Sequence, residues 1–305
     1  TAFDRYLNAH HIRWAQLQRP AFFLHLRATI SPHPNTTNRM LSHVRSLFDY
    51  LVRRQIIAAN PLNDIPPVPE RYFVPFVFSP AQTQRLLQAA SQNIRKTPKY
   101  FLTDMAIYSA IVLLARCGMR INEPLRMHRD QYYRQDGTVY IEKTKFNKDR
   151  LIPVPAAVMT QIDNYISVRK ALMRGDQSPY LLVRANQQPL TDFQVRYLFI
   201  KAVKDIGLDE PRRVAGNVNF LQPTPHSLRH SFAVGTLLRI KQRGDSAQNA
   251  LPVLAAYMGH CEYKYTSVYL RVTDALSRKQ LVDFTFRFVN EFPVHWLHPG
   301  VEIAF

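Results

Sequence analysis

Apolar residues recur at helical spacing in a segment near the start of the chain. Between Thr37 and Arg54 they follow one side of a helix, while the opposite side is polar and partly basic. The apolar side carries Met40, Val44, Leu47, Phe48 and Leu51, and the polar side carries Asn38, Ser42, Arg45, Ser46 and Arg53. The pattern predicts an amphipathic helix whose basic side either contacts a partner or simply faces water.

A proline-rich segment follows this helix. Residues 60–75, NPLNDIPPVPERYFVP, contain five prolines, and proline removes a backbone donor and disfavours helix in the residue before it. The segment therefore predicts an extended linker. Beyond it, Ser79 is a candidate N-cap, and Pro80 suits the first position of a helix that carries an apolar stripe. A second domain is thus expected to begin near residue 76.

One stretch of the second domain favours strands. Between Gly137 and Pro155 the β-branched runs TVYIEK and RLIPV flank the polar sequence FNKD, as in a hairpin with a polar tip. Helical signals dominate elsewhere. The predicted fold class is mainly α with a small β-sheet, in two domains.

The charge balance indicates a polyanionic partner. The chain has 40 Lys and Arg against 22 Asp and Glu, for a formal net charge of +18, as expected of a protein that neutralises phosphates. Nucleic acid is the leading interpretation, and general adhesion to polyanions is the alternative.

The two cysteines, Cys117 and Cys261, lack the spacing of a zinc site or a disulfide framework. The sequence therefore predicts no metal site and a reducing, cytoplasmic setting. It also contains no run of 18 apolar residues, and its first residues lack the apolar core of a signal peptide. No membrane association is expected.

Two segments place cationic side chains beside helix ends. In the first, an apolar helix reaches Gly118, a candidate C-cap, and Arg120 follows in the turn before another helix. In the second, His226 and Arg229 lie three residues apart, on one face of a helix. Each has an ordinary alternative, because Arg120 could be a surface arginine and an HxxR pair often arises by chance.

A third segment adds candidate nucleophiles. In YMGHCEYKYTSVYLRV, Tyr269 follows His260 by nine residues, and Tyr263 and Tyr265 compete with it. A lone tyrosine is more often a packing residue, so this segment gains meaning only together with the other two.

Taken in order, these segments resemble the tyrosine recombinase, or phage integrase, family. CGMRINEPLRM is similar to its first box, HSLRH to its second and YMGHCEYKYTSVYL to its third. The hairpin KTKFNKDRLIPV is similar to its lysine-bearing strand turn, and LSHVRSLFDYLVRRQIIAANPL looks like the last helices of its core-binding domain. The resemblance covers about residues 37–272.

The resemblance implies a two-domain, C-shaped clamp around DNA. A helical core-binding domain would span residues 1–65, a linker 66–75 and the catalytic domain 76–272. The tail, 273–305, lacks a close family pattern at its end, and its stretch LVDFTFRFVNEF could dock in cis or on a neighbouring protomer.

The resemblance also implies a catalytic set, carried over residue by residue: Arg120, Lys145, His226, Arg229, His260 and Tyr269, the last as nucleophile. Lys143 and Lys148 are local rivals of Lys145, and Tyr265 remains a rival of Tyr269. Candidate DNA contacts are Asn38, Ser42, Arg45, Arg53, Lys143, Lys148 and Arg150.

Such a set would cleave DNA without a metal or any other cofactor. Arg120 and Arg229 suit the negative charge that develops on the nonbridging phosphate oxygens. His260 can donate a hydrogen bond to the phosphate, and His226 can accept the phenolic proton, which Tyr269 must lose despite an ordinary pKa of about 10. The lysine would protonate the leaving 5′ oxygen.

The resemblance therefore implies site-specific recombination through a 3′-phosphotyrosine intermediate, in integration, excision or resolution of a bacterial mobile element. The expected partner is double-stranded DNA with a specific recombination site, bound as two duplexes by a homotetramer at the nucleoid. Type IB topoisomerase-like relaxation and a non-cleaving DNA-binding regulator of the same fold are the alternatives.

Overall fold

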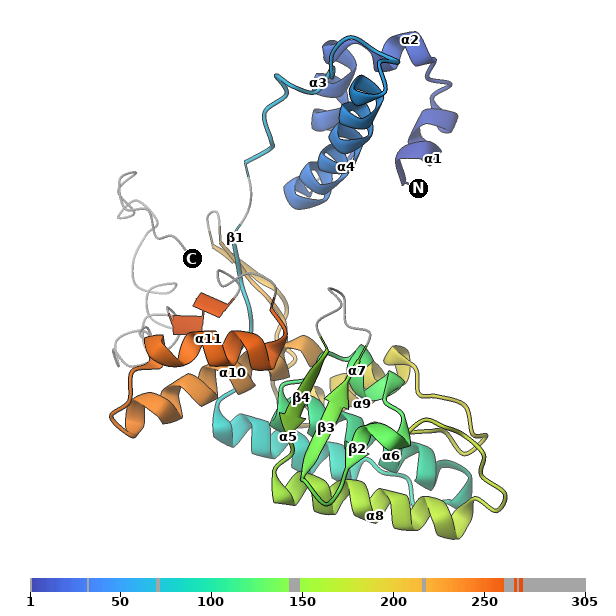
Figure 1. Cartoon of the computed structure of the whole chain (residues 1–305), viewed down its shortest axis with the longest axis vertical. Helices are drawn as coiled ribbons and strands as arrows, with labels where there is room; N and C mark the ends of the chain where they lie inside the picture. Colours follow the sequence, from blue (N-terminus) through green and yellow to red (C-terminus); the bar gives the residue numbers. More distant parts are fainter. Residues whose placement is uncertain are drawn as a thin grey trace. The chain divides into compact units, whose positions relative to one another are not determined.

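The computed structural model divides the chain into two compact units, residues 1–72 and 73–305 (Figure 1). It describes residues 2–31, 33–69, 72–142, 149–215, 218–260, 266–267 and 269–270. Helices dominate the described part of both units, with short antiparallel strands in the second. The predicted fold class, mainly α with a small β-sheet, is confirmed.

The first unit is a small helical domain around one apolar core. Its helices are α1 (Ala2–Ala9), α2 (Trp14–Leu17), α3 (Pro20–Thr29) and α4 (Pro34–Arg53). Val44 and Phe48 of α4 are buried in this core, as the sequence pattern predicts, whereas Leu47 is 49% exposed. The helix starts at Pro34 because proline needs no intrahelical donor in the first turn.

The proline-rich segment is bound to this unit over much of its length. The Arg45 guanidinium donates to the carbonyls of Leu62 and Ile65, at 3.1 and 2.9 Å. The Asn38 amide donates to the Val68 carbonyl at 2.8 Å and accepts from the Val68 amide at 2.7 Å. Asn38 and Arg45, which the sequence pattern placed on the polar side of α4, therefore bind the backbone of the proline-rich segment.

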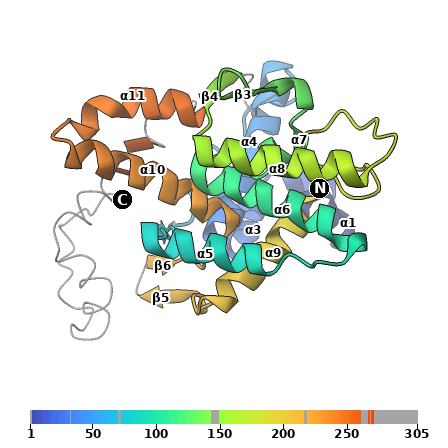
Figure 2. The same ribbon diagram turned by 90° about the horizontal axis from the view of Figure 1, so that it is seen from below.

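The second unit is built around the apolar helix α6. Its helices are α5 (Pro80–Gln92), α6 (Pro98–Cys117), α7 (Asn122–Arg126), α8 (Ala156–Leu172), α9 (Asp192–Asp205), α10 (Pro225–Gln242) and α11 (Ala247–Met258), with a 3₁₀ turn at Arg129–Gln131. Helix α6 packs against α5, α8, α9 and α10 (Figure 2). It is long and apolar enough to cross a membrane, but two thirds of its most apolar window, 67%, is buried inside the protein.

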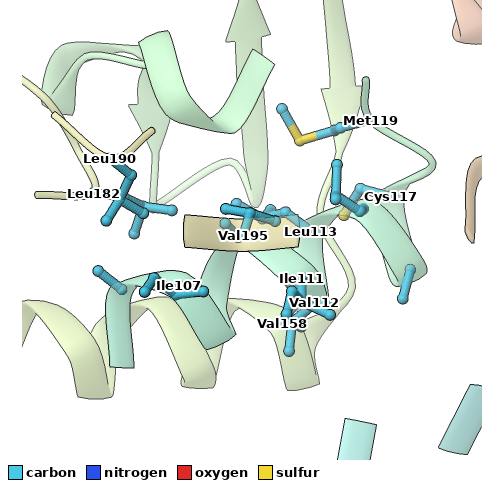
Figure 3. Close-up of a cluster of buried hydrophobic side chains, with 14 of the residues drawn as sticks. Ile107, Ile111, Val112, Leu113, Cys117, Met119, Val158, Leu182, Leu190 and Val195 are labelled. Carbon is cyan, nitrogen blue, oxygen red and sulfur yellow. The ribbon is translucent and has the colours of Figure 1, made fainter. Parts of the chain in front are cut away.

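Close packing fills the space around α6. Ile111, Val112 and Leu113 of α6 pack in one cluster with Val158 of α8 and Val195 of α9 (Figure 3).

The start of α5 follows its sequence signal: Ser79 Oγ accepts from the Gln82 amide at 3.1 Å, and the Gln82 side chain accepts from the Ser79 amide at 2.8 Å. This capping box satisfies two donors at the helix start.

Two three-stranded antiparallel sheets complete the second unit. The predicted hairpin is confirmed: β3 (Thr138–Ile141) pairs with β4 (Arg150–Pro153), and β2 (Tyr132–Tyr133) adds a third strand. The hairpin tip, residues 143–148, lies outside the described residues. The other sheet has the order β1 (Tyr72–Val74), β6 (Val218–Phe220), β5 (Arg213–Ala215). Residues 72–74, expected within the linker, thus form a strand.

The contacts of Arg45 predict a structural role for this side chain. Arg45→Ala should lower the free energy of unfolding by about 1–3 kcal/mol, because two carbonyls lose a charged donor. Arg53→Ala, on the exposed end of the same helix, should change it by no more than about 0.5 kcal/mol. Urea unfolding followed by circular dichroism measures both, and equal effects of the two substitutions would contradict the structural role.

Candidate active site

A buried arginine joins two helix ends in the second unit. Arg229 on α10 is 1% exposed. It donates from Nη1 to the Gly118 carbonyl at 2.6 Å and from Nη2 to the Met258 carbonyl. These carbonyls lie at the C-terminal ends of α6 and α11, where helices leave acceptors unsatisfied and the helix dipole favours a cation. Burial, then Arg120, lowers the pKa of Arg229 to about 10, so the side chain stays charged at neutral pH.

Arg120 lies directly after the first of these helix ends. Its Nη2 donates to the Gly259 carbonyl at 2.7 Å, and its Nη1 pairs with the Glu123 carboxylate at 3.1 Å. Its side chain is 27% exposed. The guanidinium is therefore oriented by the protein while part of it reaches solvent.

The Glu123 carboxylate ties Arg120 to the hairpin. Glu123 accepts from the Arg120 amide and from Arg150 Nη2, both at 2.8 Å. Burial raises the pKa of Glu123, but the charges and hydrogen bonds of Arg150 and Arg120 outweigh burial, and the pKa is lowered. Arg150 also donates to the Tyr257 carbonyl at 2.8 Å, and its side chain is 8% exposed. This burial favours an internal role for Arg150 over the expected DNA contact.

Two left-handed glycines make room for these contacts. Gly118 and Gly259 cap α6 and α11 with φ values of 59° and 61°. A Cβ atom on Gly118 would lie 2.4 Å from the Phe232 ring, and one on Gly259 would lie 3.1 Å from Arg150 Nη1. The expected C-cap at Gly118 is confirmed.

Tyr269 lies against α10 and α11. It is 4% exposed and packs in a cluster formed by α10 and α11. Its hydroxyl oxygen is 3.0 Å from Nδ1 of His230, and its ring stacks on His260 with 6.3 Å between centroids. Burial raises the pKa of Tyr269, while Arg229 and Arg120 act in the opposite direction. The phenol is therefore protonated at neutral pH.

Three histidines surround these groups, and the pKa of each is lowered. Burial is the largest cause, and it lowers the pKa of His260 to about 4 and that of His230 to about 3, with Arg229 contributing to both. His226, whose side chain is exposed, is also lowered, first by the surrounding protein and then by Arg229 and Arg120. All three are therefore neutral at pH 7, first because the protein shields them from water and then because positive charges lie nearby.

The structure brings five of the six expected catalytic residues into one region: Arg120, His226, Arg229, His260 and Tyr269. The sixth, Lys145, lies outside the described residues, as do its rivals Lys143 and Lys148, the alternative nucleophiles Tyr263 and Tyr265, Cys261 and the tail from residue 271.

Sequence reasoning missed His230 and Glu123. Signals for both were present, since His230 ends the HSLRH motif one turn after His226, and Glu123 follows Arg120 by three residues on a helix start. Of the candidate DNA contacts in the first unit, Ser42 and Arg53 are exposed on α4.

The converging charges suit an anion. Among the described residues, no group of three or more His, Cys, Asp or Glu side chains is arranged to hold a metal ion. Guanidinium groups, by contrast, present several donors in a plane that matches a phosphate.

The fit of Gly118 against Phe232 predicts a sharp effect of one methyl group. Gly118→Ala combines a left-handed backbone with a clash and should cost about 2–4 kcal/mol of folding free energy. The matched control is Gly235→Ala within α10, where a Cβ meets nothing within 4 Å and alanine should stabilise by about 0.5–1 kcal/mol. Thermal unfolding measures both, and a neutral Gly118→Ala would contradict the packing described.

Comparison with known proteins identifies the family of the chain. The model of the phage integrase family matches residues 77–275. The protein y4rE of Sinorhizobium fredii, to which an integrase/recombinase activity is ascribed, is 33% identical over 198 residues, which cover 64% of this chain and 59% of that protein. Tyrosine recombinase XerC of Alcanivorax borkumensis is 28% identical over 234 residues, covering 77% and 68%. The chain thus spans about six tenths of the first relative's length.

A solved structure shows the same fold. The XerH site-specific recombinase, bound to a palindromic difH substrate in a post-cleavage complex, aligns with a TM-score of 0.65 at 17% identity, over 90% of this chain and 76% of that one. The Tn1549 transposon integrase in complex with a circular intermediate DNA aligns with a TM-score of 0.58 over 82% and 78%. The family match over residues 77–275 and the shared fold lead to one conclusion: the chain belongs to the phage integrase family of tyrosine recombinases.

Proposed function

We propose that this chain is a site-specific DNA recombinase that cleaves a phosphodiester with Tyr269 and rejoins strands through a 3′-phosphotyrosine intermediate. The observation that carries the proposal is the convergence of the Tyr269 hydroxyl with Arg229, Arg120 and two histidines, from segments far apart in sequence. The family membership supports the same chemistry.

The two arginines would hold the phosphate. Each guanidinium is fixed by backbone carbonyls, Arg229 by Gly118 and Met258, and Arg120 by Gly259. Donors fixed before the reaction stabilise developing negative charge without reorganisation in the transition state. Lysine would not replace either arginine, because it lacks the planar fork that both geometries use.

Binding of the phosphate would change the protonation of the site. The histidines are neutral here because desolvation by the surrounding protein and positive neighbours disfavour another charge. A bound phosphate supplies the opposite sign, which raises the pKa of His226 and His260. His226 then becomes better able to accept the phenolic proton, and His260 better able to donate to a phosphate oxygen.

Cleavage would proceed by direct displacement. The Tyr269 oxygen forms a bond to phosphorus, the bond from phosphorus to the 5′ oxygen breaks, and the leaving oxygen takes a proton, which we assign to Lys145 by its place in the family's hairpin. The phosphotyrosine bond replaces the phosphodiester one for one. A 5′ hydroxyl of another strand can therefore reverse the attack and reseal the DNA.

The expected partner is double-stranded DNA. The net charge of +18 favours it, and DNA is present in the related XerH and Tn1549 integrase structures. We further propose that four protomers act on two duplexes, that the first unit is the core-binding domain, and that Ser42, Arg53, Lys143 and Lys148 contact DNA. The setting is the nucleoid, and the role is integration, excision or resolution of a mobile element.

Replacement of the nucleophile should abolish covalent attachment. Wild-type protein incubated with DNA of its source replicon should yield a denaturant-resistant protein–DNA adduct, and Tyr269→Phe should lower its yield at least about 1,000-fold while DNA binding persists. Tyr257→Phe is the matched control, because this half-buried tyrosine of α11 bonds the Cys117 carbonyl and should leave the adduct intact.

The same assay separates the alternatives. An undiminished adduct in Tyr269→Phe would transfer the role to Tyr265. Topoisomer ladders without a preferred site would support relaxation, and binding without any adduct would support a non-cleaving regulator. Recombination requires an adduct at a defined sequence.

The packing of Tyr269 against its own α10 and α11 predicts cleavage in cis. A mixture of Arg120→Ala and Tyr269→Phe proteins contains no chain with both an intact site and its own nucleophile, so it should form no more adduct than either variant alone. Each variant mixed with wild type is the control. Restored adduct in the double-variant mixture would show that one protomer supplies the tyrosine to another.

A further inference from the structure

The Tyr269 hydroxyl lies beside a histidine that has no assigned part in the chemistry. Nδ1 of His230 is 3.0 Å from the hydroxyl oxygen, and the two ring centroids are 5.7 Å apart. His230 directly follows Arg229 on α10 and is partly buried. The helix that carries the phosphate-binding arginine thus also contacts the nucleophile.

The protonation state of His230 depends on its burial and on its charged neighbours. From α10, His226 meets its ring edge to face at 4.6 Å, and Arg229 adds a fixed positive charge. His260, which follows α11, acts in the same direction. Burial, followed by these groups, lowers the pKa of His230 to about 3. The ring is therefore neutral near pH 7.

A neutral ring allows His230 to accept the hydrogen bond from the phenol. A neutral imidazole has one nitrogen that donates and one that accepts, and the buried phenol keeps its proton. In the tautomer with the imidazole proton on Nε2, the phenol donates and Nδ1 accepts. The contact holds the oxygen that must attack, rather than some other edge of the tyrosine ring.

We propose that His230 is the positioning residue for the nucleophile: it accepts the Tyr269 hydroxyl hydrogen bond at Nδ1 and holds the phenol oxygen beside Arg229 before DNA binds. The inference rests on the proposed function and deepens it. His230 is a weak base in this environment, so the phenolic proton passes to another acceptor, His226, once the phosphate is bound. Its contribution is orientation, since a misplacement of about 1 Å can cost about 100-fold in rate.

Substitution of His230 should separate cleavage from binding. His230→Leu removes the acceptor and should slow single-turnover adduct formation about 10- to 100-fold, with unchanged affinity for DNA. His230→Asn carries an acceptor oxygen on Cγ, where Nδ1 is attached, and should recover most of that rate. Ser231→Ala, the next residue on α10, which bonds the Phe78 amide, is the control and should leave the rate unchanged.

Outcomes that overturn the inference are distinct from failure of the proposed function. Wild-type rates in His230→Leu, or equal losses in His230→Leu and His230→Asn, would remove the positioning role while Tyr269 stays the nucleophile. A wild-type protein that forms no adduct would remove the proposed function instead.

A double-mutant cycle tests the contact without any reaction. The stability of the full-length protein is measured for His230→Leu, Tyr269→Phe and both together. A hydrogen bond in the DNA-free protein predicts that the double variant loses less than the sum of the single losses, because either substitution alone breaks the bond. Strict additivity would overturn the proposal, whatever the activity assays show.

Discussion

The contact on which the rest of the site depends is the buried guanidinium of Arg229. It bonds the carbonyl ends of α6 and α11, so it fastens together two segments separated by 140 residues of chain. A charge this deeply buried is costly unless paired. Here helix-end carbonyls offset the cost, since they would otherwise lack partners. Truncation of Arg229 would leave the carbonyls of both helix ends without this donor. By analogy with broken buried ion pairs, it would lower the free energy of unfolding by about 3–5 kcal/mol.

The electrostatic character of the site follows from the same contact. Two further arginines are held in the same region. Arg120 donates to the Gly259 carbonyl, and Arg150 donates to the Glu123 carboxylate. One buried carboxylate, Glu123, is shared between two of these arginines. Burial and then the excess positive charge lower the pKa values of His230 and His260, and the same positive charge is complementary to an anion.

Local sequence signals predicted much of this arrangement. The N-cap at Ser79, the C-cap at Gly118 and the β3–β4 hairpin each depend on residues a few positions apart, so their patterns are visible in the chain. The catalytic boxes were found because their order and spacing resemble a family. What these signals cannot reveal is which element each side chain reaches in the folded protein.

Contacts between residues far apart in the sequence account for the features that the sequence analysis did not predict. Asn38 and Arg45 lie on the polar side of α4, and nothing nearby shows that residues 62–68 fold back to meet them. The β1–β6–β5 sheet joins strands of three residues, too short for a periodic signal. His230 gained its role from a tyrosine 39 positions away. The supporting contacts therefore became visible only in the structure, which brings together five of the six residues that the family resemblance implied.

The most direct measurement is the chemical identity of the covalent link to DNA. Wild-type protein trapped on replicon DNA can be digested with protease and nuclease, and the nucleotide-bearing peptide sequenced by mass spectrometry. The account predicts a nucleotide joined through its 3′ phosphate to the Tyr269 oxygen. A 5′ linkage, or attachment to Tyr263, Tyr265 or any other residue, would contradict it.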